Sequence, residues 1–279
     1  MKQFKIGIQL YGLRNSMKED FVGTLKALSD MGYEYVEFAG YFDHTGEEIK
    51  AILDELGLKC ISVHQTLDFY DENPAEKMSF LKTFGVKYNV VPWYDRTKLA
   101  GSPDWEETKE KFVAAAKLLH EGGMKLGYHN HDFEFATHEG KYLMDYIIEA
   151  LPEEQFEPEF DTCWIHYAGV RPEEQIRRYS GRVTLVHLKD FVCKNLAAGP
   201  VYALIDADGK ATKGASLADN GFEYTPLGQG IQDIGAILTA CEECGTEYVI
   251  VEQDNVYNGM TELEAAKLSR DYLKNTFGI

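Results

Sequence analysis

Apolar and polar positions alternate in eight short segments of the chain, which are rich in β-branched and aromatic residues. A period of two is typical of β-strands, and the stretches between most of these segments repeat apolar residues at i, i+3, i+4 and i+7, as amphipathic helices do. The predicted strands occupy residues 4–11, 33–40, 58–65, 86–93, 125–131, 156–162, 183–190 and 248–254. The clearest predicted helices occupy residues 19–32, 47–57, 105–123, 142–152 and 234–245.

Several of these helices end at a glycine directly before the next strand, namely at Gly32, Gly57, Gly123 and Gly245. A repeated order of strand, helix, glycine and strand predicts parallel strands joined by crossover helices. Eight such units in about 250 residues match the size of a (β/α)₈ barrel. The main alternative, a doubly wound open sheet, normally carries a Gly-rich turn after its first strand, and residues 10–14 (LYGLR) lack one.

We therefore expect an α/β fold, a single TIM-barrel domain over residues 1–279, with an elaborated loop at 191–229 after the seventh strand. This loop contains a predicted hairpin at 201–212 that turns at Asp208-Gly209. A separate domain of that length would lack a core. On a barrel the loop would lie on the catalytic face, either as a lid or as a contact with a second subunit.

The composition describes a globular protein and excludes several partners. Lys and Arg total 28 and Asp and Glu total 46, which gives a formal charge of −18. Binding nucleic acid needs clustered basic residues, and the densest basic stretch, 171–182, is interleaved with Glu173 and Glu174. No apolar run approaches the roughly 20 residues of a membrane span. The odd number of cysteines, five, and the lack of a signal-peptide pattern at the start predict a cytoplasmic protein.

Polar side chains gather where the predicted strands end, which is where a barrel builds its active site. They are His64, the segment 129–134 (HNHDFE), Asp161, His187 with Lys189 and Asp190, and Glu252 with Gln253 and Asp254. A single acidic residue at a strand end is usually a helix N-cap, and Asp161 is well placed for that role. Several carboxylates and an imidazole converging on one mouth instead predict a divalent metal site.

Further polar and aromatic residues near the strand ends are candidates for catalysis or substrate contact. His129 and His131 are two apart on a strand and face the same way, which suits proton transfer or metal ligation. Lys189 would also point inward, to stabilise an enolate oxygen or hold a hydroxyl, unless it is a surface lysine. Gln9, Tyr11, Glu37, Trp93 and Tyr94 are weaker candidates for substrate contact. The two glycines of residues 226–230 (PLGQG) permit a close approach to backbone, such as that of substrate oxygens.

These segments resemble the sugar phosphate isomerase/epimerase family of xylose isomerase-like TIM barrels. The resemblance covers nearly the whole chain and rests on GYHNHDFEF, FDTCW, RVTLVHLKD, PLGQG and YVIVEQD. The superfamily includes ketose 3-epimerases, hydroxypyruvate isomerases, inosose dehydratases, enzymes acting on 3-oxo-glycosides, and endonuclease IV. The motifs are specific for the superfamily and not for one substrate.

The resemblance implies one divalent metal ion, with Mn²⁺ first and Mg²⁺, Co²⁺ or Zn²⁺ as alternatives. Asp161, His187 and Glu252 match three of the family's four ligands. Many members place a Glu at the end of strand five, where this chain has His129. We expect Glu134 as the fourth ligand, with His129 or His131 as the fallback.

The resemblance further implies an isomerase or epimerase that moves a proton next to the carbonyl of a keto-sugar through an enediolate. The expected catalytic residues are His129, His131, Lys189 and His64, and the expected substrate-binding residues are Gln9, Trp93 and Gln253. The alternative is a lyase that dehydrates an inosose or eliminates from a 3-oxo-glycoside, and an endonuclease-type phosphodiesterase is disfavoured by the charge. The expected partner is a small sugar, together with a second copy or a second subunit.

Overall fold

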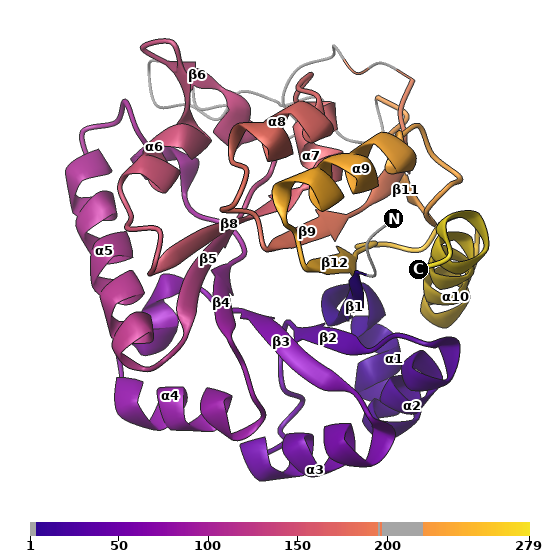
Figure 1. Cartoon of the computed structure of the whole chain (residues 1–279). Helices are drawn as coiled ribbons and strands as arrows, with labels where there is room; N and C mark the ends of the chain where they lie inside the picture. Colours follow the sequence, from indigo (N-terminus) through magenta and orange to yellow (C-terminus); the bar gives the residue numbers. More distant parts are fainter. Residues whose placement is uncertain (1–3, 195, 197–219) are drawn as a thin grey trace.

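The computed structural model describes residues 4–194, 196 and 220–279, and these form a closed barrel of eight parallel strands. The strands follow one another around the barrel in chain order, and β1 pairs with β12 to close it (Figure 1). The predicted (β/α)₈ fold is therefore confirmed. The barrel strands are β1 (Lys5–Gln9), β2 (Tyr35–Phe38), β3 (Lys59–His64), β4 (Tyr88–Val91), β5 (Lys125–His129), β8 (Phe156–Asp161), β9 (Leu185–Leu188) and β12 (Tyr248–Val251).

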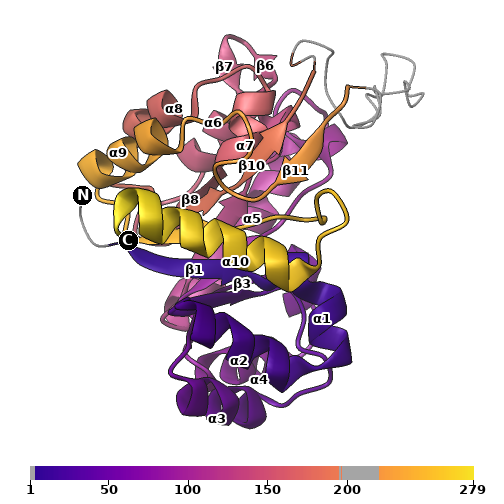
Figure 2. The ribbon, with the colours of Figure 1, turned by 90° about the vertical axis from the view of Figure 1, so that its right-hand side faces the viewer.

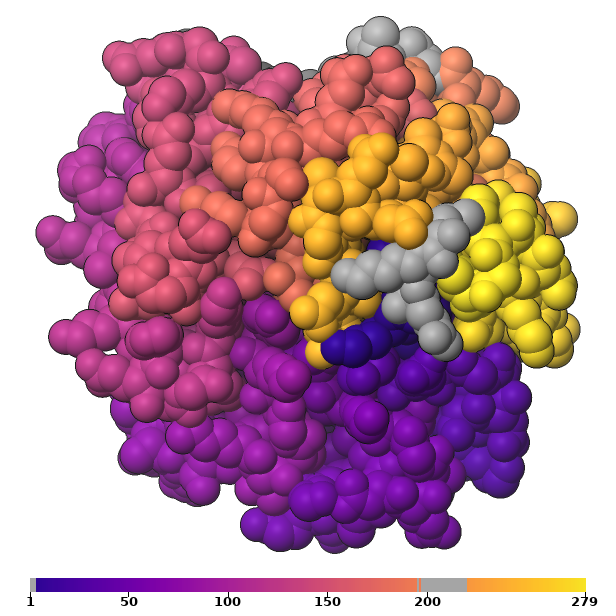
Figure 3. Space-filling view, viewed as in Figure 1, coloured from indigo at the N-terminus to yellow at the C-terminus, as the bar shows by residue number. Residues whose placement is uncertain are grey.

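Helices surround this barrel, and the successive segments of the chain occupy successive sectors of the surface (Figure 3). The five helices predicted from periodicity are all present, and α2 and α3 end at the predicted Gly32 and Gly57 in the left-handed conformation (φ 92° and 69°). The α-helices are α1 (Arg14–Glu19), α2 (Phe21–Met31), α3 (Gly46–Leu56), α4 (Pro74–Thr83), α5 (Trp105–Glu121), α6 (Leu143–Glu149), α7 (Thr162–Tyr167), α8 (Pro172–Arg178), α9 (Ile234–Cys244) and α10 (Glu262–Tyr272). Within the described residues, none of these helices combines the length and apolar character needed to cross a bilayer.

Among the residues that the structure describes, two short antiparallel pairs lie outside the barrel sheet, and both are visible in Figure 2. The first joins β6 (Thr137–His138) to β7 (Lys141–Tyr142), and the second joins β10 (Asp190–Val192) to β11 (Glu223–Thr225). The second pair ties together the two ends of the predicted loop insertion. The predicted hairpin at 201–212 lies outside the described residues.

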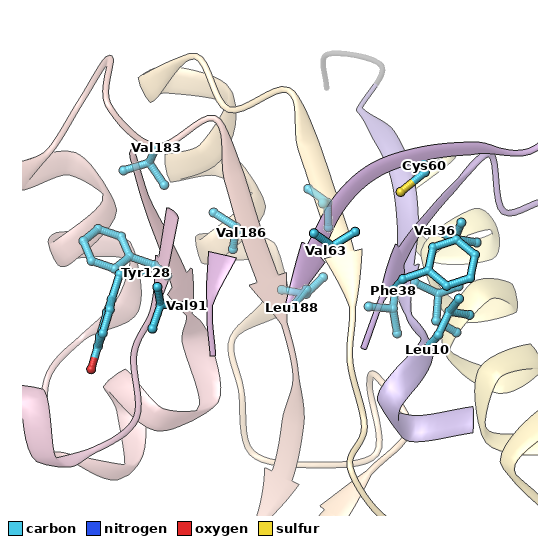
Figure 4. Close-up of a cluster of buried hydrophobic side chains, with 14 of the residues drawn as sticks. Leu10, Val36, Phe38, Cys60, Val63, Val91, Tyr128, Val183, Val186 and Leu188 are labelled. Atoms are coloured by element: carbon cyan, nitrogen blue, oxygen red, sulfur yellow. The ribbon is translucent and has the colours of Figure 1, made fainter. Parts of the chain in front are cut away.

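The main apolar core fills the space between the barrel and its helices. Outward-facing side chains such as Val36, Phe38, Val63 and Leu188 belong to it (Figure 4). Because successive residues of a strand face opposite sides, the residues between these apolar positions point into the barrel. The alternation that builds the outer core therefore also selects which side chains enter the interior.

The barrel interior is apolar in one part and polar in another. A small apolar cluster contains Ile61, Leu185, Tyr248 and Ile250. Charged and polar side chains continue along the same strands toward their C-terminal ends and are buried there, which is costly unless each group finds a partner. They include Gln9, Glu37, Ser62, Glu159 and His187.

The segment 226–230 is held by a carboxylate from the start of β10. The Asp190 carboxylate accepts hydrogen bonds from the backbone N–H groups of Gly228 (2.9 Å), Gly230 (3.0 Å) and Gln232 (3.1 Å). A Cβ atom at Gly230 would lie 2.1 Å from Asp190 Oδ1, so only glycine fits there. The predicted close approach is real, and the group that approaches is Asp190 rather than a substrate oxygen.

We expect Asp190→Asn to lower the free energy of unfolding by about 1–3 kcal/mol, because an amide group would face buried N–H donors that need an acceptor. Urea unfolding followed by circular dichroism measures this change. Asp104→Asn is the matched control, because Asp104 is exposed and makes no capping hydrogen bond with its side chain at the start of α5. Equal stability of the two variants would contradict the role assigned to Asp190.

Candidate metal centre and active site

Four side chains from the ends of neighbouring barrel strands converge on one point. His129 ends β5, Asp161 ends β8, His187 lies in β9 and Glu252 directly follows β12. One ligand atom of each lies within 4.8 Å of the ligand atoms of the others, and all four side chains are buried. We call these four residues the outer group. Asp161, His187 and Glu252 therefore lie close together, as the predicted metal site requires.

The distances within the outer group are those of side chains gathered around a common centre. His187 Nδ1 lies 2.9 Å from Glu252 Oε2, and His129 Nε2 lies 3.3 Å from Asp161 Oδ2 and 3.4 Å from Glu252 Oε2. Two imidazole nitrogens and two carboxylates are suitable donors for a divalent transition metal. His129 Nε2 is buried and makes no hydrogen bond within the described part of the chain, as expected of a nitrogen kept for a cation.

Asp161 has two roles, one for each carboxylate oxygen. It is the N-cap of α7, where Oδ1 accepts a hydrogen bond from the backbone N–H of Trp164 (3.0 Å). This cap fixes the orientation of the carboxylate and directs Oδ2 toward His129. The capping role and the metal-binding role weighed as alternatives from the sequence are thus compatible.

Lys189 points into the outer group, as its position two residues after His187 predicted. Its Nζ atom lies 2.7 Å from Glu252 Oε2, 2.9 Å from Asp161 Oδ2 and 3.2 Å from Asp254 Oδ2. Burial lowers the pKa of Lys189, but the three carboxylates raise it further, so the pKa lies well above its usual value. Lys189 is accordingly a buried ammonium group.

Glu134 lies outside this centre. It is buried in a 3₁₀ turn at Phe133–Phe135, where Oε1 accepts from the Tyr128 hydroxyl (2.6 Å) and Oε2 from the His131 backbone N–H (2.7 Å). Burial raises the pKa of Glu134 to about 7. The strand ends at His129, so the chain turns before Glu134 can reach the mouth. The geometry favours His129, the fallback, as the fourth ligand.

A pocket of about 490 Å³ opens directly above the outer group. His129, His131, Lys189 and Glu252 form part of its wall, and Trp93, which is 54% exposed, lies at its rim. His131 packs against Phe133 (ring centroids 5.9 Å apart, planes 6° apart) and Trp164. Burial, followed by the nearby charges of His129 and Lys189, holds the pKa of His131 well below its usual value.

Two of the predicted substrate-binding residues do not line this pocket. Gln9 is buried in the barrel, where Nε2 donates to Glu37 Oε1 (2.5 Å) and Oε1 accepts from the Tyr11 backbone N–H (2.9 Å). Gln253 lines a separate small cavity and donates to the backbone carbonyl of Asn255. Trp93 is the one of the three that lines the pocket.

His64 belongs to a second buried group, deeper in the barrel, which also contains Glu37, Glu159 and His187. We call these four residues the inner group. Glu159 was not recognised from the sequence. It lies two residues before Asp161 on one strand, and this spacing places both side chains on the same face, so the alternation contained the signal. His187 is shared by the inner and outer groups.

Comparison with known proteins agrees with this architecture. Residues 25–276 match the model of the xylose isomerase-like TIM barrel family. The chain belongs to this family. An inosose dehydratase of Clostridium perfringens strain 13 is 27% identical over 277 aligned residues, which cover 91% of this chain and 89% of the relative.

Solved structures share the fold at lower identity. A sugar phosphate isomerase/epimerase from Parabacteroides distasonis is 20% identical with a TM-score of 0.74, covering 99% of this chain and 95% of that one. The IolI protein with a bound zinc atom is 18% identical with a TM-score of 0.68, covering 97% of each chain. The family match over residues 25–276, together with the inosose dehydratase relative, makes this chain an enzyme of the xylose isomerase-like superfamily.

We expect Asp161→Asn to weaken Mn²⁺ binding by more than the roughly 10–100-fold typical of losing a residue that only supports a ligand. Glu134→Gln should leave the affinity unchanged, because both carboxylate oxygens of Glu134 are occupied elsewhere. Isothermal titration of the two folded variants with Mn²⁺ measures the difference. A comparable loss in Glu134→Gln would restore Glu134 as the fourth ligand.

Proposed function

We propose that this protein is a divalent-metal-dependent isomerase or epimerase that transfers a proton at the carbon next to the carbonyl of a keto-sugar. The observation that supports it is the outer group at the floor of a sugar-sized pocket, with His131 and Lys189 beside it. Metal, base and ammonium group are the parts that enolisation needs.

His129, Asp161, His187 and Glu252 would hold the cation. When bound, a divalent cation withdraws electrons from a carbonyl group and so acidifies the adjacent C–H bond. Mn²⁺ remains our first choice, and the second imidazole, in place of the usual carboxylate, favours Zn²⁺ and Co²⁺ more than a set with one imidazole does.

His131 is the best-placed base. It lines the pocket and belongs to neither group of metal-binding side chains, whereas His129 is occupied as a ligand. The His131 ring stacks on Phe133 and contacts Trp164 at a tilt of 40°, and these contacts restrict its direction. The proton leaves the substrate carbon for an imidazole nitrogen. In an isomerase it returns from the same side to the neighbouring carbon, whereas an epimerase would protonate the first carbon from an acid on the opposite face.

Lys189 supplies positive charge where negative charge develops on the substrate oxygen. Asp161, Glu252 and Asp254 position its ammonium group, and the rings of Trp164 and Tyr224 lie 5.6 Å and 5.2 Å from Nζ. A preorganised charge of this kind costs no rearrangement during the reaction. His64, also in the wall, lies next to the metal ligands and would support them.

The pocket favours a neutral sugar over a phosphorylated one. Among its described lining residues, Lys189 is the one Lys or Arg side chain, and it already contacts three carboxylates. Phosphate recognition usually uses Arg forks or free Lys groups. Trp93 at the rim offers a flat apolar surface for a sugar ring.

A lyase reaction is the second candidate, and the inosose dehydratase relative favours it. The first step is the same transfer of a proton from the carbon beside the carbonyl to His131. The hydroxyl on the next carbon then departs with a proton as water, and a double bond forms. The substrate would be a cyclic keto-polyol.

Incubation in D₂O with Mn²⁺ tests both candidates on a panel of ketoses, inososes and 3-oxo-glycosides. An isomerase or epimerase would place deuterium on carbon in a product of unchanged composition. A dehydratase would release water and form a conjugated enone with ultraviolet absorption. Absence of exchange across the panel would contradict both.

We expect His131→Gln to lower the rate of proton exchange by about 10²–10⁴-fold, the usual contribution of a general base. His120→Gln is the matched control, because His120 lies on the exposed side of α5 away from the pocket. Mass spectrometry of deuterium uptake in both variants gives the comparison. Exchange in His131→Gln at the wild-type rate would exclude His131 as the base.

A further inference from the structure

The inner group lies inside the barrel, on the other side of His187 from the outer group. His187 directs Nδ1 toward Glu252 of the outer group and Nε2 toward Glu37 and Glu159 of the inner group. We propose that Glu37, His64, Glu159 and His187 form a second divalent-cation site, which takes Zn²⁺ and shares the His187 ring with the first. This goes beyond the proposed reaction, which needs a single cation.

The four ligand atoms of the inner group alternate nitrogen and oxygen around a ring. His64 Nε2 lies 3.0 Å from Glu37 Oε1 and 2.9 Å from Glu159 Oε2. His187 Nε2 lies 2.8 Å and 3.1 Å from the same two oxygens. A Zn²⁺ ion held tetrahedrally at about 2.0–2.2 Å separates its ligand atoms by roughly 3.3–3.6 Å, so these four atoms would move apart by a few tenths of an ångström to take one.

Hydrogen bonding accounts for two of the four contacts, that of His64 with Glu159 Oε2 and that of His187 with Glu37 Oε1. The two Nε2 atoms carry at most one proton each, yet they make four close contacts with carboxylate oxygens. Glu37 Oε1 also accepts from Gln9 Nε2, and His64 Nε2 lies 3.0 Å from the same oxygen with no second proton to donate to it. A cation at the centre satisfies all four ligand atoms at once.

Glu159 provides an independent observation. Its side chain is fully buried, and Oε1 has no hydrogen-bond partner within the described residues. A buried carboxylate oxygen without a partner is costly. A carboxylate that binds a cation through both oxygens would remove this cost.

The surroundings suit a bound Zn²⁺. Two carboxylates balance the two charges of one cation when the imidazoles are neutral, so the buried site carries no net charge. The Ser62 hydroxyl and the Gln9 amide donate to Glu37 and hold its carboxylate in place. His64 reaches the pocket wall, which provides the way in. Imidazole together with carboxylate is a common Zn²⁺ ligand combination.

Sharing of His187 links the two sites. With one cation bound at Nδ1, the ring keeps its proton on Nε2 and donates it to Glu37 or Glu159. A second cation at Nε2 would displace that proton to solvent, so His187 would be shared as an imidazolate, and the Lys189 ammonium beside Glu252 would offset its negative charge. The two sites therefore share one ligand, and the inner site can be empty while the outer one is filled.

Equilibrium dialysis of the full chain against Zn²⁺ with elemental analysis tests the proposal. The wild type should retain two Zn²⁺ ions per chain, and Glu159→Gln and Asp161→Asn should each retain one. Glu157→Gln is the matched control and should retain two, because Glu157 lies on the same strand but pairs with Lys125 outside both groups. One ion in the wild type and one in Glu159→Gln would overturn the second site while leaving the outer site and the deuterium exchange intact.

Anomalous diffraction at the zinc edge, from wild-type crystals soaked in Zn²⁺, tests the same point without any substitution. Two peaks, one between Glu37, His64 and Glu159 and one beside Asp161, are expected. A peak beside Asp161 alone would overturn the proposal, even if Glu159→Gln proved too unstable to purify.

Discussion

The polar interior of the barrel depends above all on His187, a buried imidazole that pairs with carboxylates through both of its ring nitrogens. His187 contacts Glu252 through Nδ1 and both Glu37 and Glu159 through Nε2, and all four side chains are buried. Buried carboxylates are tolerated only with partners of opposite charge or with a metal. His187 lies in β9, and its partners come from β2, β8 and the end of β12. Their contacts therefore link opposite sides of the barrel and hold its polar interior together.

This polar interior distinguishes the chain from a barrel filled with branched apolar side chains. The apolar cluster around Leu185 and Ile250 occupies only part of the interior, and charged groups continue from there to the mouth. Stability is supplied mainly by the apolar layer between barrel and helices (Figure 4). The interior can therefore hold ions and protonated groups, which the proposed proton transfer requires, without weakening the main core.

Much of the site was accessible from sequence because period-two alternation and barrel closure act together. Alternation assigns His187 and Lys189 to one face, and closure brings the strand ends together, so Asp161, His187 and Glu252 were expected to meet. The same logic would have found Glu159 had the whole strand been considered rather than its end. Glu134 was placed wrongly relative to the pocket because its position depends on where a strand stops, and alternation does not report that.

The sequence by itself determined the fold, the order of the strands and the residues that face inward, because these follow from local periodicity and from the rule that parallel strands need crossover helices. Only the tertiary structure decided which polar groups pair. Gln9 binds Glu37 instead of a ligand, Asp190 holds the glycines of 226–230, and His129 rather than Glu134 completes the outer group. Each choice depends on distances of about 3 Å between residues far apart in the chain, and such distances are set by packing rather than by local pattern.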